Sequence, residues 1–186
     1  GVTVQGRRGL FYGLGLTTGP SGLFIAEPVR ADGAILGVVV VKISLEPLQA
    51  TWMHGADPVV LRDSRGIVFL SAVPEWLFHG IRPVSAAELR WVAAHRQYGN
   101  RDRFPVLPWT IESRSATPAF VLHTSVQGRR TNLLALDTPL PELGWTLTVT
   151  TDMKEVVQAR LLALVAAALA VALLLLGALY WRLREK

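Results

Sequence analysis

The stretch VVLRDSRGIVFLS, residues 59–71, decides the fold of this chain. Two apolar segments, residues 59–63 and 67–71, flank the turn-forming residues Ser64, Arg65 and Gly66. Short segments rich in β-branched and aromatic side chains, separated by a turn that contains glycine, are typical of a β-hairpin. We therefore predict two antiparallel strands joined at residues 64–66.

The residues after this hairpin predict a helix and then more strands. Ser85-Ala86-Ala87-Glu88 has the spacing of a capping box, which predicts a helix from there to about Tyr98. Residues 99–116 are rich in Pro, Arg and Asn and are predicted to form a loop. Three further strands are predicted, at residues 119–125, 131–137 and 145–151. Two strands, one helix and three antiparallel strands are the order of a PAS-like α+β module.

The residues before the hairpin predict part of a second module. Apolar residues 10–16 and 23–29 flank the turn-rich segment 17–22, which favours a hairpin. Residues 35–43 are rich in valine and show no alternation, which predicts a strand covered on both faces. A short helix follows, to about Met53. We expect the back half of a similar module, because its early elements are missing.

The C-terminal part contains a long apolar segment. Residues 161–181 include no charged side chain, and such a helix rises by about 1.5 Å per residue, enough to cross a bilayer core of about 30 Å. The alternative is a buried core helix, but a helix apolar on every face exceeds what so small a domain can cover. Arg182, Arg184 and Lys186 follow at once, and basic residues favour the cytoplasmic side. We predict a single C-terminal transmembrane helix with the preceding residues outside.

These elements predict four regions and a cellular location. Residues 1–54 form the C-terminal part of a membrane-distal module, and residues 55–151 form a membrane-proximal PAS-like module. Residues 152–182 form the juxtamembrane and transmembrane helix, and residues 183–186 begin a cytoplasmic region. We expect a bacterial inner-membrane protein with residues 1–158 in the periplasm. The chain begins at Gly1 without an initiator methionine, so we expect a fragment truncated at both ends.

Composition excludes several classes of function. The chain has 186 residues, a net charge of +5 and no cysteine, so disulfides and thiolate metal sites are excluded. Its four histidines show no metal-ligand spacing, and we expect no metal and no cofactor. The arginines are scattered, which argues against a nucleic-acid partner and suits a small anionic ligand. We find no nucleophile elbow, phosphate loop or close carboxylate pair, and therefore predict no catalysis by this chain.

Several short stretches, taken in order, resemble one known family. They are residues 11–15, 17–19, 37–45, 66–71, 74–76, 96–98 and 140–147. The chain resembles the periplasmic sensory region of DctB-type C4-dicarboxylate sensor histidine kinases, which has a double-Cache, tandem PAS-like fold. The resemblance runs from about Gly9 to Arg184.

The resemblance implies a ligand and a binding site. In that family the membrane-distal module binds a dicarboxylate such as succinate, fumarate or malate. A Thr-Thr-Ser turn of the family corresponds to Leu16-Thr17-Thr18, and a strand-ending lysine corresponds to Lys42. Carboxylates only accept hydrogen bonds, so they need hydroxyls, backbone N–H groups and a cation. We predict ligand binding by Tyr12, Thr17, Thr18 and Lys42.

The function that these features predict is reception of a signal. We predict the extracytoplasmic sensory and transmembrane part of a two-component sensor histidine kinase. Its partners would be the membrane, a second copy in a homodimer, and a response regulator reached through a cytoplasmic domain. The alternatives are a Cache sensor of a chemotaxis receptor or nucleotide cyclase, and a membrane-anchored enzyme of another class. The residues that follow Lys186 in the parent protein discriminate between these outputs.

Overall fold

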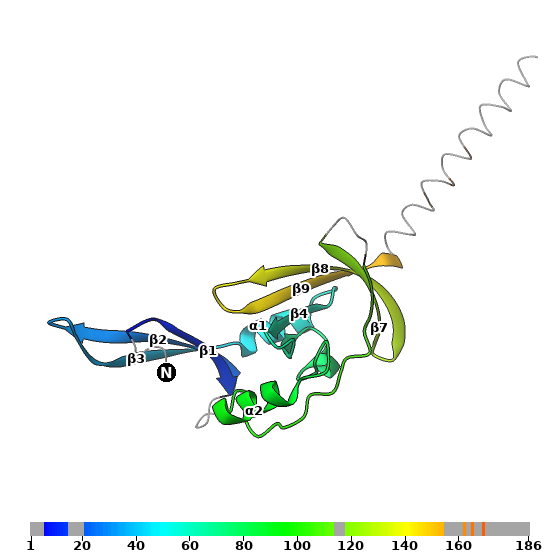
Figure 1. Cartoon of the computed structure of the whole chain (residues 1–186). Coiled ribbons are helices and arrows are strands. Elements are labelled where there is room, and N and C mark those ends of the chain that lie inside the picture. The colour runs from blue at the N-terminus through cyan, green and yellow to red at the C-terminus, as the bar shows by residue number, and fades with distance from the viewer. Residues whose placement is uncertain are drawn as a thin grey trace, which may run out of the picture.

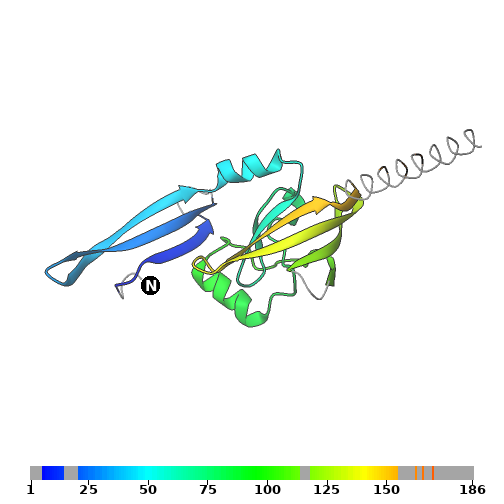
Figure 2. The same ribbon diagram turned by 90° about the horizontal axis from the view of Figure 1, so that it is seen from above.

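The computed structural model describes residues 6–14, 21–113 and 118–154, together with Leu162, Val165 and Leu169. These residues form two antiparallel sheets, one of three strands and one of six. The smaller sheet projects away from the larger one, and helix α1 (Glu46–Met53) connects the two (Figure 1). Figure 2 shows the same arrangement from above, with the N-terminal strands beside one end of the larger sheet.

The three-stranded sheet has the order β1-β2-β3. Its strands are β1 (Gly9–Leu14), β2 (Ser21–Ala31) and β3 (Ala34–Ser44). The N-terminal hairpin and the valine-rich strand are therefore confirmed. The predicted coverage of that strand on both faces is wrong for the described residues, because Val39 and Val40, which point to opposite faces, are 55% and 56% exposed.

The six-stranded sheet has the order β5-β4-β9-β8-β7-β6. Its strands are β4 (Val59–Asp63), β5 (Val68–Ser71), β6 (Thr110–Ser113), β7 (Ala119–Val126), β8 (Arg129–Leu140) and β9 (Trp145–Asp152). The hairpin at 59–71 and the three later strands are confirmed. The prediction of a continuous loop over residues 99–116 is wrong, since β6 pairs there with β7.

Helix α2 (Ala86–His95) begins as its capping box predicts. The Ser85 hydroxyl accepts a hydrogen bond from the N–H of Glu88, and the Glu88 carboxylate accepts one from the N–H of Ser85. The helix ends three residues before the predicted Tyr98, because Arg96 adopts a left-handed conformation with φ of 47°. The short 3₁₀ helix η2 (Pro74–Trp76) lies between β5 and α2.

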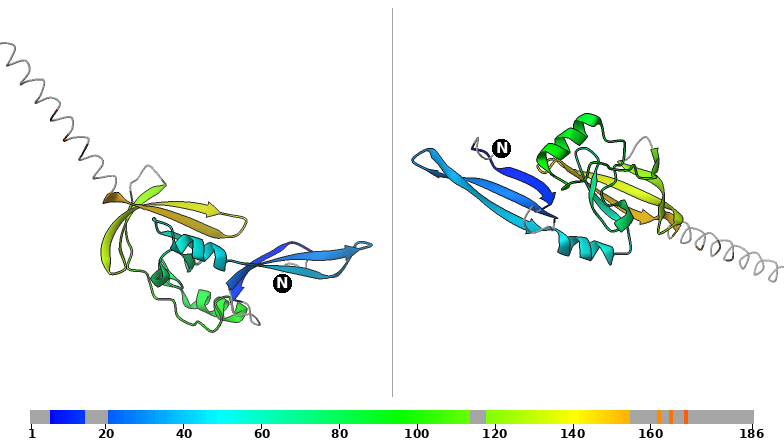
Figure 3. Two further views of the ribbon diagram at one scale, coloured as in Figure 1. Left: turned by 180° about the vertical axis from the view of Figure 1, so that it is seen from behind. Right: turned by 90° about the horizontal axis from the view of Figure 1, so that it is seen from below.

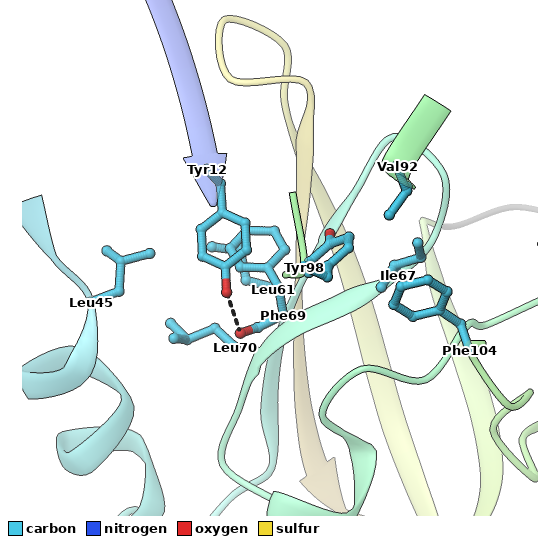
Figure 4. Packing of buried hydrophobic residues seen from close by; sticks show 9 residues of the cluster. All are labelled: Tyr12, Leu45, Leu61, Ile67, Phe69, Leu70, Val92, Tyr98 and Phe104. Atoms are coloured by element: carbon cyan, nitrogen blue, oxygen red, sulfur yellow. Dashed lines mark hydrogen bonds between the residues drawn. The ribbon is translucent and has the colours of Figure 1, made fainter. Parts of the chain in front are cut away.

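Two hydrophobic clusters cover opposite faces of the larger sheet. Val60 and Leu61 are neighbours in β4 and point to opposite faces, yet both are buried. Val60 belongs to a cluster with Val68, Trp76, Leu122 and Leu133. The cluster around Leu61 includes residues of both sheets, and Figure 4 shows its members: Tyr12, Leu45, Leu61, Ile67, Phe69, Leu70, Val92, Tyr98 and Phe104. The small sheet is therefore fixed to the large one at this cluster.

The predicted transmembrane segment lies outside the described residues, apart from Leu162, Val165 and Leu169. In the part of the chain that the structure describes, no helix has the length and hydropathy needed to cross a bilayer. The two sheets separate close to residue 54, where α1 has ended and β4 has not begun. The division of the chain into four regions stays a prediction.

Candidate functional site

One face of the small sheet, at the end nearest the β1–β2 connection, carries two aligned rows of residues. Phe11, Phe24 and Lys42 lie opposite one another across the three strands. In the row closer to the connection, Gly13 lies opposite Gly22. Because side chains alternate along a strand, both rows point to the same face.

The glycine pair leaves space that neighbouring side chains occupy. A Cβ atom built on Gly22 would lie 2.8 Å from Cε of Lys42, and one on Gly13 would lie 2.6 Å from the Phe11 ring. The aliphatic stem of Lys42 therefore passes over Gly22. Its ammonium group, Nζ, lies 5.7 Å from the centroid of the Phe24 ring, within the range of a cation–π contact.

Tyr12, the second described residue of the predicted site, belongs to the opposite face of this sheet. It lies in the row of Leu23 and Ile43, one residue out of phase with Lys42. Its side chain is 2% exposed, and its hydroxyl donates a hydrogen bond to the carbonyl of Phe69 at 3.4 Å (Figure 4). Burial raises the pKa of Tyr12 to about 12, against a smaller lowering effect of the Ser21 side chain.

The structure therefore separates Lys42 from Tyr12 and groups Lys42 with residues that the sequence did not single out. Sequence analysis did not identify Gly22 and Phe24. The strand register could have indicated them, because the turn-rich segment 17–22 of the sequence decides which residues lie opposite one another. Thr17 and Thr18 lie outside the described residues. Ligand binding by all four predicted residues stays a prediction.

Two contacts tie the small sheet and its helix to the large sheet. The ring of Tyr12 lies 4.0 Å from that of Phe69, centroid to centroid, and packs edge-on against Trp145. The side-chain amide of Gln49 in α1 donates to the carbonyl of Ser71 and accepts from its N–H. Both contacts reach β5, so a movement of β1 or α1 acts on the same strand of the second sheet.

Within the described ranges, no group of three or more His, Cys, Asp or Glu side chains is arranged to hold a metal ion. Some charged groups on the larger sheet instead pair with one another. Arg62 donates to both carboxylate oxygens of Asp137, at 3.0 and 2.7 Å. Burial opposes ionisation of Asp137, but the hydrogen bonds from Arg62 and Thr148 outweigh it and lower its pKa. We interpret this pair as a structural feature of the sheet.

Comparison with known proteins shows two curated relatives with the same description. The chain is 31% identical over 150 residues to the C4-dicarboxylate transport sensor protein DctB of Pseudomonas aeruginosa, a match of 78% of this chain and 21% of that protein. It is 29% identical over 179 residues to the DctB protein of Rhizobium meliloti, a match of 94% and 28%. The chain thus spans about a quarter of their length. No family description matches.

Two solved structures share the fold. The sensor domain of the histidine kinase DctB of V. cholerae superposes with a TM-score of 0.67 and 28% identity, over 81% of this chain and 58% of that one. The periplasmic domain of RsbU from Chlamydia trachomatis gives 0.58 and 11% identity, over 82% and 57%, and shows the fold alone.

The antiparallel sheets and these structural matches define the class of this protein as a PAS/Cache-like sensor domain. The predicted PAS-like architecture is confirmed at this level. Within that class, sequence identity to the two curated relatives and to the solved sensor domain is far above that to RsbU. In sequence and in fold, this chain is therefore similar to DctB-type sensor domains.

Proposed function

We propose that this chain is the extracytoplasmic sensory part, with its membrane anchor, of a two-component sensor histidine kinase that detects a C4-dicarboxylate. The observation that carries the proposal is its identity of 31% to a protein described as a C4-dicarboxylate transport sensor. The similarity covers both sheets, because 94% of this chain aligns with the second relative.

The ligand site that we propose lies on the Lys42 face of the small sheet. The Lys42 ammonium supplies a cation, and Thr17 and Thr18 of the adjoining segment supply hydroxyl donors. Gly13 and Gly22 leave room for the Phe11 ring and the Lys42 stem, so that the Lys42 side chain lies against the sheet on this face. A charge-assisted hydrogen bond to one ligand carboxylate contributes about 1.5–3 kcal/mol.

The signal passes from the small sheet to the large one in this proposal. Tyr12 and Gln49 form the described contacts between β1, α1 and β5, so a shift of the small sheet on ligand binding acts on β5. The ligand moves this equilibrium only as far as its affinity differs between the two states. Residues 152–182 then carry the shift across the inner membrane to a kinase domain in the cytoplasm. A homodimer and a cognate response regulator complete the proposal.

The test is a calorimetric titration of the full-length parent protein in nanodiscs with succinate. Lys42→Ala is expected to weaken binding by roughly 10- to 150-fold, the equivalent of one charge-assisted hydrogen bond. Lys154→Ala is the matched control, because Lys154 is an exposed lysine just after the last strand of the larger sheet. Equal affinity of Lys42→Ala and the parent would remove Lys42 from the site. Absence of succinate binding by the parent would refute the C4-dicarboxylate proposal itself.

The membrane orientation has its own readout. Protease added to intact spheroplasts is expected to digest the residues that precede the apolar segment. Digestion only after lysis would place them on the cytoplasmic side and contradict an extracytoplasmic sensor.

A further inference from the structure

The far end of the larger sheet carries a second set of aligned residues, and these are polar. Thr110, His123 and Asn132 lie opposite one another across β6, β7 and β8. In the next row on the same face, Ser125 lies opposite Arg130. Five polar side chains from three adjacent strands therefore point to one side of the sheet.

These five residues line a pocket of about 450 Å³, and Pro108 and Thr124 complete its lining. The pocket is an open depression, because Thr110, Arg130 and Asn132 are exposed, and its volume falls within the range of sites for small molecules, about 300–1,000 Å³. Among the described residues, those that line the pocket come from β6, β7, β8 and, with Pro108, the segment just before β6, and none comes from the small sheet. β7 and the small sheet lie at opposite ends of the molecule in both views of Figure 3, so this pocket is distinct from the Lys42 face.

One donor of the pocket, Asn132, is held by a hydrogen bond to another lining side chain, His123. Nδ1 of His123 lies 2.8 Å from Oδ1 of Asn132. With the imidazole N–H donating to that oxygen, the NH₂ group of Asn132 is left as a donor. The other histidines differ: Nδ1 of each lies within hydrogen-bonding distance of a backbone carbonyl, of Ala50 for His54, Leu77 for His79 and Trp91 for His95.

The charge balance of the pocket favours an anion. Arg130 supplies a guanidinium group with a fixed pair of donors that matches carboxylate or phosphate oxygens. A carboxylate of β6 lies beside the lining: Oε2 of Glu112 is 3.5 Å from Nε2 of His123, and the Glu112 side chain is 71% exposed. Thr110 and Ser125 add hydroxyl donors. The lining therefore offers several donors and one permanent positive charge, the complement that an oxyanion requires.

We propose that this pocket binds a small oxyanion, through a carboxylate or phosphate group, at a second site independent of the Lys42 face. Arg130 binds the anion with its guanidinium fork, and Thr110, Ser125 and the NH₂ group of Asn132 donate to the remaining oxygens. His123 orients Asn132. The same group could belong to a free metabolite or to a phospholipid headgroup, and the experiment separates these two sources.

The experiment observes histidine side chains by NMR in the full chain, labelled with ¹⁵N-histidine and held in nanodiscs of zwitterionic lipid. Inorganic phosphate and succinate are titrated separately. The imidazole signal of His123 is expected to shift and to saturate at millimolar concentrations with at least one of the two. The signals of His54, His79 and His95 are the internal controls and are expected to stay in place. A shift of all four together, or no saturable shift of His123 in any arm, would overturn the proposal.

Two adjacent arginines provide matched variants. Arg130→Ala removes the cation that lines the pocket, whereas Arg129→Ala removes the same charge from the neighbouring position, which does not line it. Arg130→Ala is expected to weaken anion binding by about tenfold or more, as loss of a charge-assisted hydrogen bond predicts. Arg129→Ala is expected to change it by less than about twofold, since an exposed charge outside the pocket is screened. Equal losses of anion affinity in the two variants would show that the hairpin attracts anions only through its overall charge, and would refute a defined binding site.

The lipid composition of the nanodiscs distinguishes the two sources of the anion. A His123 shift in phosphate-free nanodiscs that contain an anionic phospholipid, abolished by Arg130→Ala, would identify a headgroup as the occupant. A shift only on addition of phosphate or succinate would identify a free anion. Lys42→Ala is expected to leave every His123 shift unchanged, which separates this site from failure of the dicarboxylate proposal. Far-UV circular dichroism checks that each variant is folded.

Discussion

The two sheets contain strands of similar composition, but the side chains of those strands are buried to different extents. β3 and β4 are both rich in aliphatic residues, yet Val60 and Leu61 of β4 are buried, whereas the large apolar side chains of β3 are exposed. The larger sheet has α2, η2 and Tyr12 packed against it, whereas the described part of the smaller sheet contacts the rest only near Tyr12 and Leu45. Composition therefore shows that a strand requires cover, but not which segment covers it.

The small sheet exposes several large apolar side chains. Leu36, Val38, Val39, Val40, Val41 and Ile43 are all exposed in this one strand. Contiguous apolar patches of this kind mark interaction surfaces more often than scattered single residues do. The solved V. cholerae sensor domain is longer than the region shared with this chain, which matches 58% of it. Both faces of β4 in the larger sheet are therefore covered at Val60 and Leu61, whereas both faces of β3 in the small sheet are open in the described residues.

The largest expected difference between the two sheets is in the free energy of unfolding that is lost when one leucine side chain is removed from each. Leu122→Ala removes a fully buried side chain of the large sheet, and Leu36→Ala removes one that is 70% exposed in the small sheet. The first is expected to lower the free energy of unfolding by about 2–5 kcal/mol, because it leaves a cavity. The second is expected to change it by about 0.5 kcal/mol or less. Urea denaturation measures both, and equal losses would mean that β3 is covered.

A smaller effect is expected where the sheets meet. Tyr12→Phe keeps the ring and removes the hydroxyl that donates to Phe69, at an expected cost of about 0.5–1.5 kcal/mol. Hydrogen exchange is expected to rise in β1 and β5, which this contact joins, and to stay unchanged in β7. Uniform exchange in all three strands would show that Tyr12 does not couple the sheets.

The pH dependence of stability gives a second test of the environment of Tyr12. Its pKa in the folded protein, about 12, lies above the value of about 10 in an unfolded chain, so folding favours the neutral phenol. The stability from this group is complete below about pH 10 and is lost as the pH rises from 10 towards 12. Tyrosinate absorbance is expected to show a group titrating near pH 12 that Tyr12→Phe removes. Its titration near 10 would place Tyr12 in solvent.

The smallest effect is expected at the start of α2, at the surface of the larger sheet's module. The Arg82 guanidinium, with further hydrogen bonds from Ser85, lowers the pKa of Glu88 to about 2. Stability from this carboxylate is therefore present above its unfolded pKa of about 4.3 and is lost as the pH falls from there towards 2. Glu88→Gln is expected to flatten the dependence of α2 amide exchange on pH in that window. An unchanged profile would show that the capping box is not maintained in solution.

Features set by neighbours in sequence were predictable. The hairpin at 59–71, the capping box of Ser85 and Glu88, and the three later strands depend on turn chemistry and side-chain alternation. β6 was missed because its four residues follow a segment rich in proline and arginine and pair with one neighbouring strand only. Its existence depends on β7, which no local pattern in residues 110–113 indicates.

The candidate site divides in the same way. The sequence alone placed Lys42 at the end of a strand and Thr17 and Thr18 in a connection, because strand length and turn residues are local properties. Only the tertiary structure decided that Tyr12 points away from Lys42 into the other sheet, that β4 lies beside β9, and that His123 lies beside Asn132. These placements depend on pairing and burial between residues distant in sequence, whose free energy is realised only when the chain is folded.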